Sequence, residues 1–303
     1  MARGRKPKEG GDSAAVSEAV GTPLRGELLH KALGDVSRTA DGSGYAFTRL
    51  TCCGKGVTTL PTALQLYVHL RYIDISNNKI RDLAAFSRLP YLLTLNASGN
   101  NIEDISCLSS PEALPYLFLL NLSSNKISKP PQLGLQRLTR LALDANPITT
   151  LEGFVQPPLL THLSLRGTPL ETLDSLPPSD TITSLYLSHT PMQQLRQLQR
   201  LPQIKTLDLE GVPLPPDQLH ILVLLPKLRE LSLSSPEQYA DEEHFRAEIL
   251  GVLPRLQWIN GRVVTPEELK AARALREASA QQEKELGQQS NEQQQEGEET
   301  IES

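Results

Sequence analysis

Nine short stretches of this chain share one order of apolar and polar positions. Each carries apolar residues at its first, fourth and sixth positions and then a polar loop, most clearly over residues 70–80 and 117–127. The first positions, from Phe47 to Leu228, are 21 to 25 residues apart. Because side chains alternate across a strand, the fourth and sixth residues share one face. One unit cannot bury that face alone, so neighbouring units must stack.

This order, L-x-x-L-x-L-x-x-N-x-L, resembles the leucine-rich repeat. It predicts an α/β solenoid with a parallel sheet on the concave side. The return segments are short, so we expect 3₁₀ or single-turn helical segments on the convex side. Helical caps should close both ends. Phe47 and Cys52 are assigned to core positions of the first repeat.

The repeats divide the chain into a central array with flanking segments. The expected order is a disordered basic tail, an N-terminal helical cap, nine repeats, a C-terminal cap, a helix and a disordered acidic Gln/Glu tail. These correspond to residues 1–22, 23–46, 47–236, 237–264, 265–286 and 287–303. Within the N-terminal cap, apolar residues at helical spacing predict a helix over 24–36.

The C-terminal cap carries a recognisable motif. Phe245-Arg246 precedes Leu-Pro-Arg-Leu-Gln-Trp at 253–258, which resembles the cap of intracellular proteins with 22-residue repeats. We expect Trp258 in the core of this cap. Thr265 and Glu268 form a capping box around Pro266 and predict the start of the next helix. That helix has few apolar residues, so it is either a solvated extension or a helix that docks on a partner.

The loop position after each strand changes character along the array. The ninth position is asparagine in four repeats and then becomes Thr, Thr, Val and Pro. Proline follows the ninth position four times, at Pro147, Pro169, Pro191 and Pro213. An asparagine side chain can satisfy buried backbone groups, whereas proline stiffens a loop without a hydrogen bond. The change is either a second style of loop or drift at a tolerant position.

Charge and composition exclude several classes of function. The net charge of −5 resides mainly in the acidic tail, and a nearly neutral body argues against a nucleic-acid partner. No apolar run reaches 18 residues, which argues against a membrane partner. Three cysteines without a C-x-x-C pair suit a reducing compartment such as the cytoplasm. The histidines have no metal-ligand spacing, and no nucleophile stands beside a base. We therefore expect no metal, no cofactor and no enzymatic activity.

The remaining candidate site is the concave face of the predicted sheet. Residues at the third, fifth and seventh positions should point toward it, and tyrosines are the best anchors since they combine contact area with low entropy cost. Solvation alone could also explain a polar strand face. The candidate partner-binding residues are Tyr72, Asp74, Asn96, Asn121, Arg140, Asp144, Arg166, Tyr186, Asp208 and Glu210.

The segment from Thr22 to Asp82 has a more specific resemblance. It contains Thr-Pro-Leu at 22–24, Arg-Thr-Ala-Asp-Gly at 38–42, and Tyr-Val-His-Leu-Arg-Tyr-Ile-Asp-Ile-Ser at 67–76. In these motifs it resembles the leucine-rich repeat proteins of ciliary and flagellar radial spokes. The resemblance implies a non-enzymatic structural subunit of the axoneme, located in the cytoplasm and cilium, with other axonemal or radial-spoke proteins as partners. The proline-bearing later loops depart from the usual asparagine pattern, so partner residues there are not carried over.

A second interpretation is a regulatory subunit of a protein phosphatase, similar to regulators with 22-residue repeats. It would require a defined acidic and aromatic patch on the concave face. The sequence places residues of mixed sign there instead, so the axonemal scaffold is the preferred reading.

Overall fold

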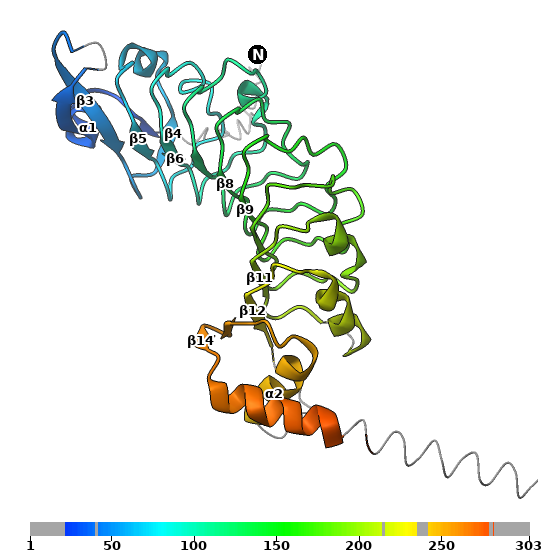
Figure 1. Cartoon of the computed structure of the whole chain (residues 1–303). Helices are drawn as coiled ribbons and strands as arrows, with labels where there is room; N and C mark the ends of the chain where they lie inside the picture. Colours follow the sequence, from blue (N-terminus) through cyan, green and yellow to red (C-terminus); the bar gives the residue numbers. More distant parts are fainter. Residues whose placement is uncertain (1–21, 40–41, 214–215, 235–241, 279–280, 282–303) are drawn as a thin grey trace, which may run out of the picture.

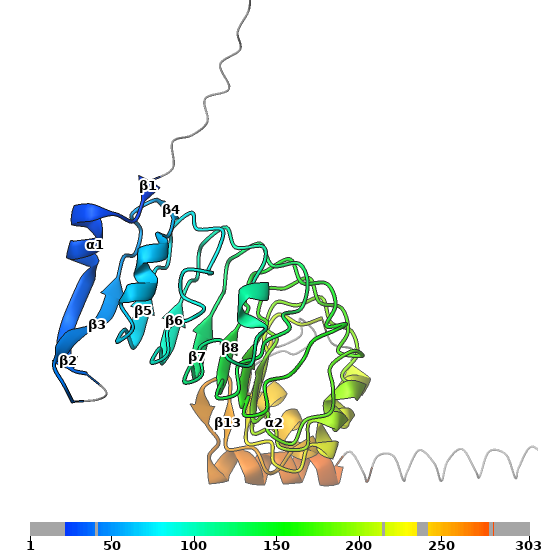
Figure 2. The ribbon, with the colours of Figure 1, turned by 90° about the horizontal axis from the view of Figure 1, so that it is seen from above.

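The computed structural model describes residues 22–39, 42–213, 216–234, 242–278 and 281. They form one curved solenoid, with the sheet along the inner side of the arc and short loops and helical turns along the outer side (Figure 1; Figure 2). The predicted acidic tail and all of the predicted basic tail except Thr22 lie outside the described residues.

One sheet runs through the whole array. Each repeat contributes one strand, and consecutive repeat strands pair in parallel and in register, so that Leu120 lies between Leu95 and Leu141. The predicted leucine-rich repeat solenoid is therefore confirmed. The nine repeat strands are β3 (Tyr45–Thr51), β5 (Tyr72–Asp74), β6 (Thr94–Asn96), β7 (Leu119–Asn121), β8 (Arg140–Ala142), β9 (His162–Ser164), β10 (Ser184–Tyr186), β11 (Thr206–Leu209) and β12 (Glu230–Leu233).

The convex side is built from tight helical turns, as the short return segments predict. Four of them are 3₁₀ helices: η1 (Thr62–Leu66), η2 (Ser106–Leu108), η3 (Arg196–Arg200) and η4 (Pro216–Leu224). The core lies between these turns and the sheet. Leu138, Leu141 and Leu143, at the first, fourth and sixth positions of one repeat, are all buried there.

The eighth position of the repeat requires a left-handed backbone. Eight consecutive repeats have a positive φ there, from Gly54 at 63° to Gly211 at 69°. Four of the eight residues are not glycine: Asn77, Ser124, Ala145 and His189. Glycine is free at such a φ, whereas other L-residues are strained. The turn that returns the chain from the sheet therefore has one fixed geometry throughout.

The N-terminal cap differs from the predicted helix. Helix α1 covers only Gly26–Ala32, and the chain then forms strand β2 (Leu33–Arg38), which pairs antiparallel with β3. The short strand β1 (Thr22–Pro23) pairs with β4 (Val57–Thr59). Gly34 has a low helix propensity, and Asp35 has a left-handed backbone with a φ of 50°, so the helix does not continue through them. The sheet is therefore extended at this end by one strand.

The assignment of Phe47 to the core is wrong. Elsewhere the chain turns between the first position and the strand, which directs the first side chain inward. Strand β3 instead has seven residues, so strict alternation continues and places Phe47 on the same face as Arg49. Thr48 and Leu50 are buried, whereas 39% of Phe47 remains exposed.

The expectation that Trp258 lies in the core is also wrong. Strand β13 (Trp258–Ile259) adds a tenth parallel strand beyond β12, and β14 (Arg262–Val263) turns back against it. Leu256 and Ile259 occupy the first and fourth repeat positions and are buried. Trp258 is thus at the third position, next to Glu230, and remains 43% exposed on the concave side.

A buried arginine joins the elements of the C-terminal cap. Arg246 lies in helix α2 (Glu242–Val252) and is only 3% exposed. Its Nε donates to Glu268 at 2.7 Å, and its Nη1 donates to the carbonyl of Ile259 at 2.8 Å. The hydrogen bond from Arg246 is the main reason that the pKa of Glu268 is lowered.

The predicted capping box is confirmed. The N–H of Thr265 donates to Glu268 at 2.7 Å, and the N–H of Glu268 donates to the Thr265 hydroxyl at 3.2 Å. Residues 266–278 are helical, and Ala272 is buried against α2. The start of this helix is therefore part of the cap and not a free extension. The rest of the predicted span, except residue 281, falls outside the described residues.

The four loop asparagines link neighbouring repeats. The Nδ2 of Asn125 donates to Leu122 and Ser123 in its own repeat and to Ala97 in the previous one, while its Oδ1 accepts from Ile102 N–H. Asn78, Asn100 and Asn146 make the corresponding bonds. The amide thus satisfies backbone groups that stacking would otherwise bury unpaired.

The second half of the array lacks these links. The hydroxyls of Thr168 and Thr190 each donate to a carbonyl of their own repeat. In the first half the next residue also donates backward, as from Lys126 N–H to Ile102. Pro147 and its successors have no N–H to donate. The structure therefore supports a second style of loop, in which Thr168 and Thr190 bond within their own repeats and do not link neighbouring ones.

Leu143→Asp should unfold the array around the fifth repeat. It places a charge in a core that several repeats share, and we expect a loss of at least about 3 kcal/mol of unfolding free energy in urea. The control is Arg140→Asp, on the opposite face of the same repeat, which should leave stability nearly unchanged. Normal stability of Leu143→Asp would refute the assigned register.

Asn125→Thr should destabilise the first half of the array. Threonine can keep the bond to its own repeat but leaves Ile102 N–H and the Ala97 carbonyl without their partner, at a cost of about 1–3 kcal/mol. Chemical denaturation measures the change. Asn101→Thr is the matched control because no described hydrogen bond uses the Asn101 side chain. An equal effect of both variants would contradict the linking role.

Candidate functional site

The third and fifth positions of the repeats form two columns along the concave face. In-register pairing puts Asp74, Asn96 and Asn121 side by side in one column. The other column includes Tyr72 and Arg140. All ten predicted residues occupy the third, fifth or seventh position, each next to the buried fourth or sixth residue of its repeat. The structure thus places them on one face or its rim, and their role in partner binding stays a prediction.

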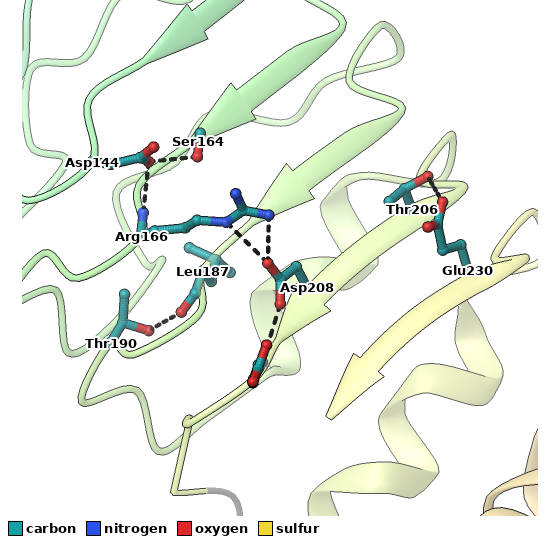
Figure 3. Close-up of polar contacts among 9 residues, drawn as sticks. Asp144, Ser164, Arg166, Leu187, Thr190, Thr206, Asp208 and Glu230 are labelled. Atoms are coloured by element: carbon teal, nitrogen blue, oxygen red, sulfur yellow. Dashed lines mark hydrogen bonds and ion pairs between the residues drawn. The ribbon is translucent and has the colours of Figure 1, made fainter. Parts of the chain in front are cut away.

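Four of the predicted residues lie together in the second half of the array: Asp144, Arg166 and Asp208, which Figure 3 shows, and Tyr186. Arg166 extends across β10 to β11, where its Nη2 and Nε donate to Asp208 Oδ2 at 2.7 and 3.0 Å. The Arg166 guanidinium also lies 4.5 Å from the centre of the Tyr186 ring. Asp208 is nearly buried, with 9% of its side chain exposed, whereas Arg166 is 46% exposed. The cation and the ring therefore form one fixed unit.

Asp144 anchors the other end of this unit. Its Oδ1 accepts from the Ser164 hydroxyl and, at 2.9 Å, from the backbone N–H of Arg166 (Figure 3). Its Oδ2 lies 3.5 Å from the Ser123 hydroxyl. Asp144 thus fixes the backbone from which the Arg166 side chain starts, and these contacts span the repeats from β7 to β11.

A second group lies in the first half of the array. The Arg49 guanidinium lies 4.9 Å from the centre of the Tyr72 ring. The Asn96 side chain donates to Asp74 at 3.1 Å, and Ser76 N–H donates to the same carboxylate at 3.0 Å. Burial by itself would raise the pKa of Asp74, but its hydrogen bonds, chiefly from Ser76, lower it. Asp74 is therefore held as an acceptor within the sheet face.

The other predicted residues are less constrained. Asn121 accepts from Ser123 N–H at 3.0 Å, and Glu210 contributes its backbone N–H to Asp208 at 3.2 Å. Arg140 is exposed beside His162, whose pKa is lowered by burial and by this neighbouring cation. Arg140 and the Glu210 side chain are thus available to solvent, unlike the Arg166–Asp208 pair.

Sequence reasoning missed four concave-face residues. Val36, Tyr45 and Phe47 lie on the β2–β3 hairpin, and Trp258 lies on the tenth strand. A signal for Trp258 was present, since Leu256 and Ile259 have the spacing of the first and fourth positions. The hairpin has no such signal, because it begins before the repeat pattern does.

The described residues offer little for cofactor chemistry. Within them no group of three or more His, Cys, Asp or Glu side chains is placed to hold a metal ion. The backbone donors of the loop after β3 are already used within the array, because Lys55 N–H and Val57 N–H both donate to the Asn78 side chain. Burial raises the pKa of the Cys107 thiol to about 11. As far as the chain is described, no helix is long and apolar enough to cross a bilayer.

One cavity lies away from the sheet, on the convex side near the C-terminal cap. It measures about 630 Å³ and is bounded by η4, α2 and the helix over 266–278. Leu225, Leu253 and Leu275 are among its apolar walls, and Arg255 and Arg276 also line it. This hollow is the second surface feature that a partner could occupy.

The fold is a leucine-rich repeat solenoid, and a family model agrees over part of the chain. The model described as Leucine Rich repeats (2 copies) matches residues 68–110. The leucine-rich repeat domain of APL1B aligns with a TM-score of 0.54 and 18% identity, over 70% of this chain and 68% of that one. At this identity the likeness shows the fold alone.

Curated relatives share a shorter segment. The chain is similar to leucine-rich repeat-containing protein 23, with 35% identity to the Homo sapiens protein over 81 residues and 32% to the Bos taurus protein over 83. It is also 43% identical over 79 residues to leucine-rich repeat and guanylate kinase domain-containing protein of Homo sapiens.

These matches are partial on both sides. They cover 26% to 27% of this chain. The chain spans only 24% of the bovine protein, 23% of its human counterpart and 10% of the guanylate kinase domain-containing protein. The recognised resemblance is confirmed over this segment, and what those whole proteins do is a matter for proposal.

Arg166 and Asp208 should be energetically coupled. Removing either by substitution with alanine loses the two-nitrogen contact, and a double-mutant cycle should give a coupling of about 1 kcal/mol, kept small by the exposure of Arg166. Urea denaturation of the four proteins measures it. A cycle between Arg166 and Glu210 is the control and should be near zero. A vanishing Arg166–Asp208 coupling would contradict the fixed unit.

Proposed function

We propose that this protein is a non-enzymatic scaffold of the ciliary or flagellar axoneme that binds other axonemal or radial-spoke proteins through its concave face. The observation that carries the scaffold role is the continuous parallel sheet, whose exposed face presents ordered arginine, tyrosine and carboxylate side chains over many repeats. Such a long, shaped surface suits protein recognition rather than the enclosure of a small substrate.

The axonemal location is supported by resemblance. The motifs between Thr22 and Asp82 resemble the radial-spoke leucine-rich repeat proteins, and the similarity to leucine-rich repeat-containing protein 23 agrees with that reading. The cytoplasm is the compartment we propose for assembly, because all three cysteines are free thiols.

One observation favours the second candidate, a regulatory subunit of a protein phosphatase. The last strands place Glu230 beside Trp258, and the Glu230 carboxylate accepts from Thr206 at 3.0 Å. This gives the C-terminal end of the concave face the acidic and aromatic character that such a regulator would need. The axonemal scaffold remains our first choice because it has motif support as well.

A tagged full-length chain expressed in a flagellated cell should locate along the axoneme and remain with it after detergent extraction. Tyr72→Ala combined with Tyr186→Ala should reduce retention at least fivefold, because two aromatic anchors in the middle of the concave face are lost. Fluorescence of extracted axonemes measures the retained fraction. The control Tyr116→Ala removes an exposed tyrosine from a turn before β7 and should behave as wild type.

Two results would overturn the proposal. A diffuse pool that detergent removes completely would exclude the axonemal location. Co-purification of that pool with a phosphatase catalytic subunit in fixed ratio would establish the second candidate instead.

A further inference from the structure

The β2–β3 hairpin exposes large apolar side chains at the N-terminal end of the sheet. Val36 is 59% exposed, Tyr45 73% and Phe47 39%. Val36 is directly opposite Phe47, and Arg38 is directly opposite Tyr45. Directly opposed residues of an antiparallel pair share one face, so all four side chains lie together. A cluster of this kind at the surface indicates an interaction site.

This cluster continues the concave face. Tyr45, Phe47 and Arg49 alternate along β3, and Arg49 is in register with Tyr72 on β5. The hairpin is the last part of the sheet in this direction among the described strands, and Figure 2 shows β2 as the outermost one. A partner segment that lies along the concave face and passes Tyr72 on β5 would therefore contact Phe47 on β3 and then Val36 on β2.

The hairpin surface is also positively charged. Arg38 and Arg49 belong to it, and Arg71 adjoins it, since its Nη2 donates to the carbonyl of Arg38 at 3.2 Å. In the part of the chain that the structure describes, the carboxylate paired with these arginines is that of Asp35, which bonds Arg49 Nε at 2.5 Å. The guanidinium groups of Arg38 and Arg71 thus remain without a described carboxylate partner.

The arrangement is organised before any partner binds. Arg49 is held between Asp35 and the face of the Tyr72 ring. Aromatic and arginine side chains with fixed orientation lose little entropy on binding and are the residue types that dominate interfaces.

We propose that the hairpin surface, formed by Val36, Arg38, Tyr45, Phe47 and Arg49, docks an acidic segment of a partner protein that carries aromatic or aliphatic side chains. This inference rests on the proposed scaffold function and names the partner's chemistry at one end of its face. The apolar side chains of the segment pack on Phe47 and Val36, and its carboxylates pair with Arg38 and Arg71.

A second copy of this chain is a poorer occupant. In a symmetric dimer the same patch would meet itself, and the arginines of the two copies would oppose one another. The exposed apolar area of three side chains is also small beside the roughly 1,200–2,000 Å² that a stable interface buries. An acidic partner avoids the repulsion between arginines, and it can gain further contact along the concave face.

The probe for the test is a fluorescein-labelled peptide of twelve residues that alternates glutamate with phenylalanine and valine. Titration with the full chain, followed by fluorescence anisotropy, should show saturable binding. The same peptide with lysine in place of glutamate should bind at least tenfold more weakly, because it would face the arginines with like charge.

Variants locate the binding site. Val36→Ser, Phe47→Ser and Arg38→Glu should each weaken binding of the glutamate peptide at least tenfold. The matched controls are Val155→Ser, since Val155 is 54% exposed on the convex side, and Arg81→Glu in the loop after β5. Both controls should bind as wild type. All the substituted side chains are at least partly exposed, so circular dichroism should show an unchanged fold.

Three results would overturn the inference: no saturable binding, equal binding of the lysine peptide, or unchanged affinity in Phe47→Ser and Arg38→Glu. A dimer in sedimentation that Phe47→Ser abolishes would assign the surface to a second copy instead. The binding measurement uses purified protein, so a failure of axonemal localisation would leave its outcome intact, and the two proposals can fail separately.

Discussion

Every feature of this molecule depends on the inability of one repeat to bury its own strand face. A three-residue strand and a short return segment expose more apolar surface than they cover, so a repeat is stable only between neighbours. Leu120 of β7 is buried because β6 and β8 supply Leu95 and Leu141 on either side. The sheet, the curvature and the long concave face follow from this stacking. The ends are the places where stacking stops, and both carry an extra antiparallel strand, β2 and β14.

Stacking also buries backbone groups, and the array satisfies them in two ways. In the first half an asparagine amide reaches into the previous repeat, as Asn125 does toward Ala97. In the second half the loop residues Thr168 and Thr190 bond only within their own repeats, and proline removes the next donor. The left-handed eighth position is common to both halves. The geometry of the turn is thus constant, while the polar links that the ninth position makes between repeats change.

The concave face combines satisfied and available groups. Arg166, Tyr186 and Asp208 hold one another, and Asp74 is held by Ser76 and Asn96. Such groups give the face a fixed shape at little further entropic loss on binding. The exposed groups at its two ends differ in character: arginines and aromatic side chains stand on the N-terminal hairpin, whereas Glu230 and Trp258 stand at the C-terminal cap. The two ends of the face therefore differ in charge, and the proposed partner would meet different chemistry at each.

The sequence by itself determined the solenoid, the 3₁₀ turns and the capping box at Thr265, because each depends on residues close together in the chain. It also placed the ten candidate residues on one face, since strand alternation is a local rule. The tertiary structure decided which of them meet: Arg166 reaches Asp208 across 42 positions because β10 and β11 stack in register. The spacing of Leu256 and Ile259 also carries the repeat signal for the tenth strand, on which Trp258 is exposed. The tertiary structure decided the N-terminal end, where β2 pairs beside β3 and Phe47 is exposed, because a strand outside the repeats leaves no trace in their period.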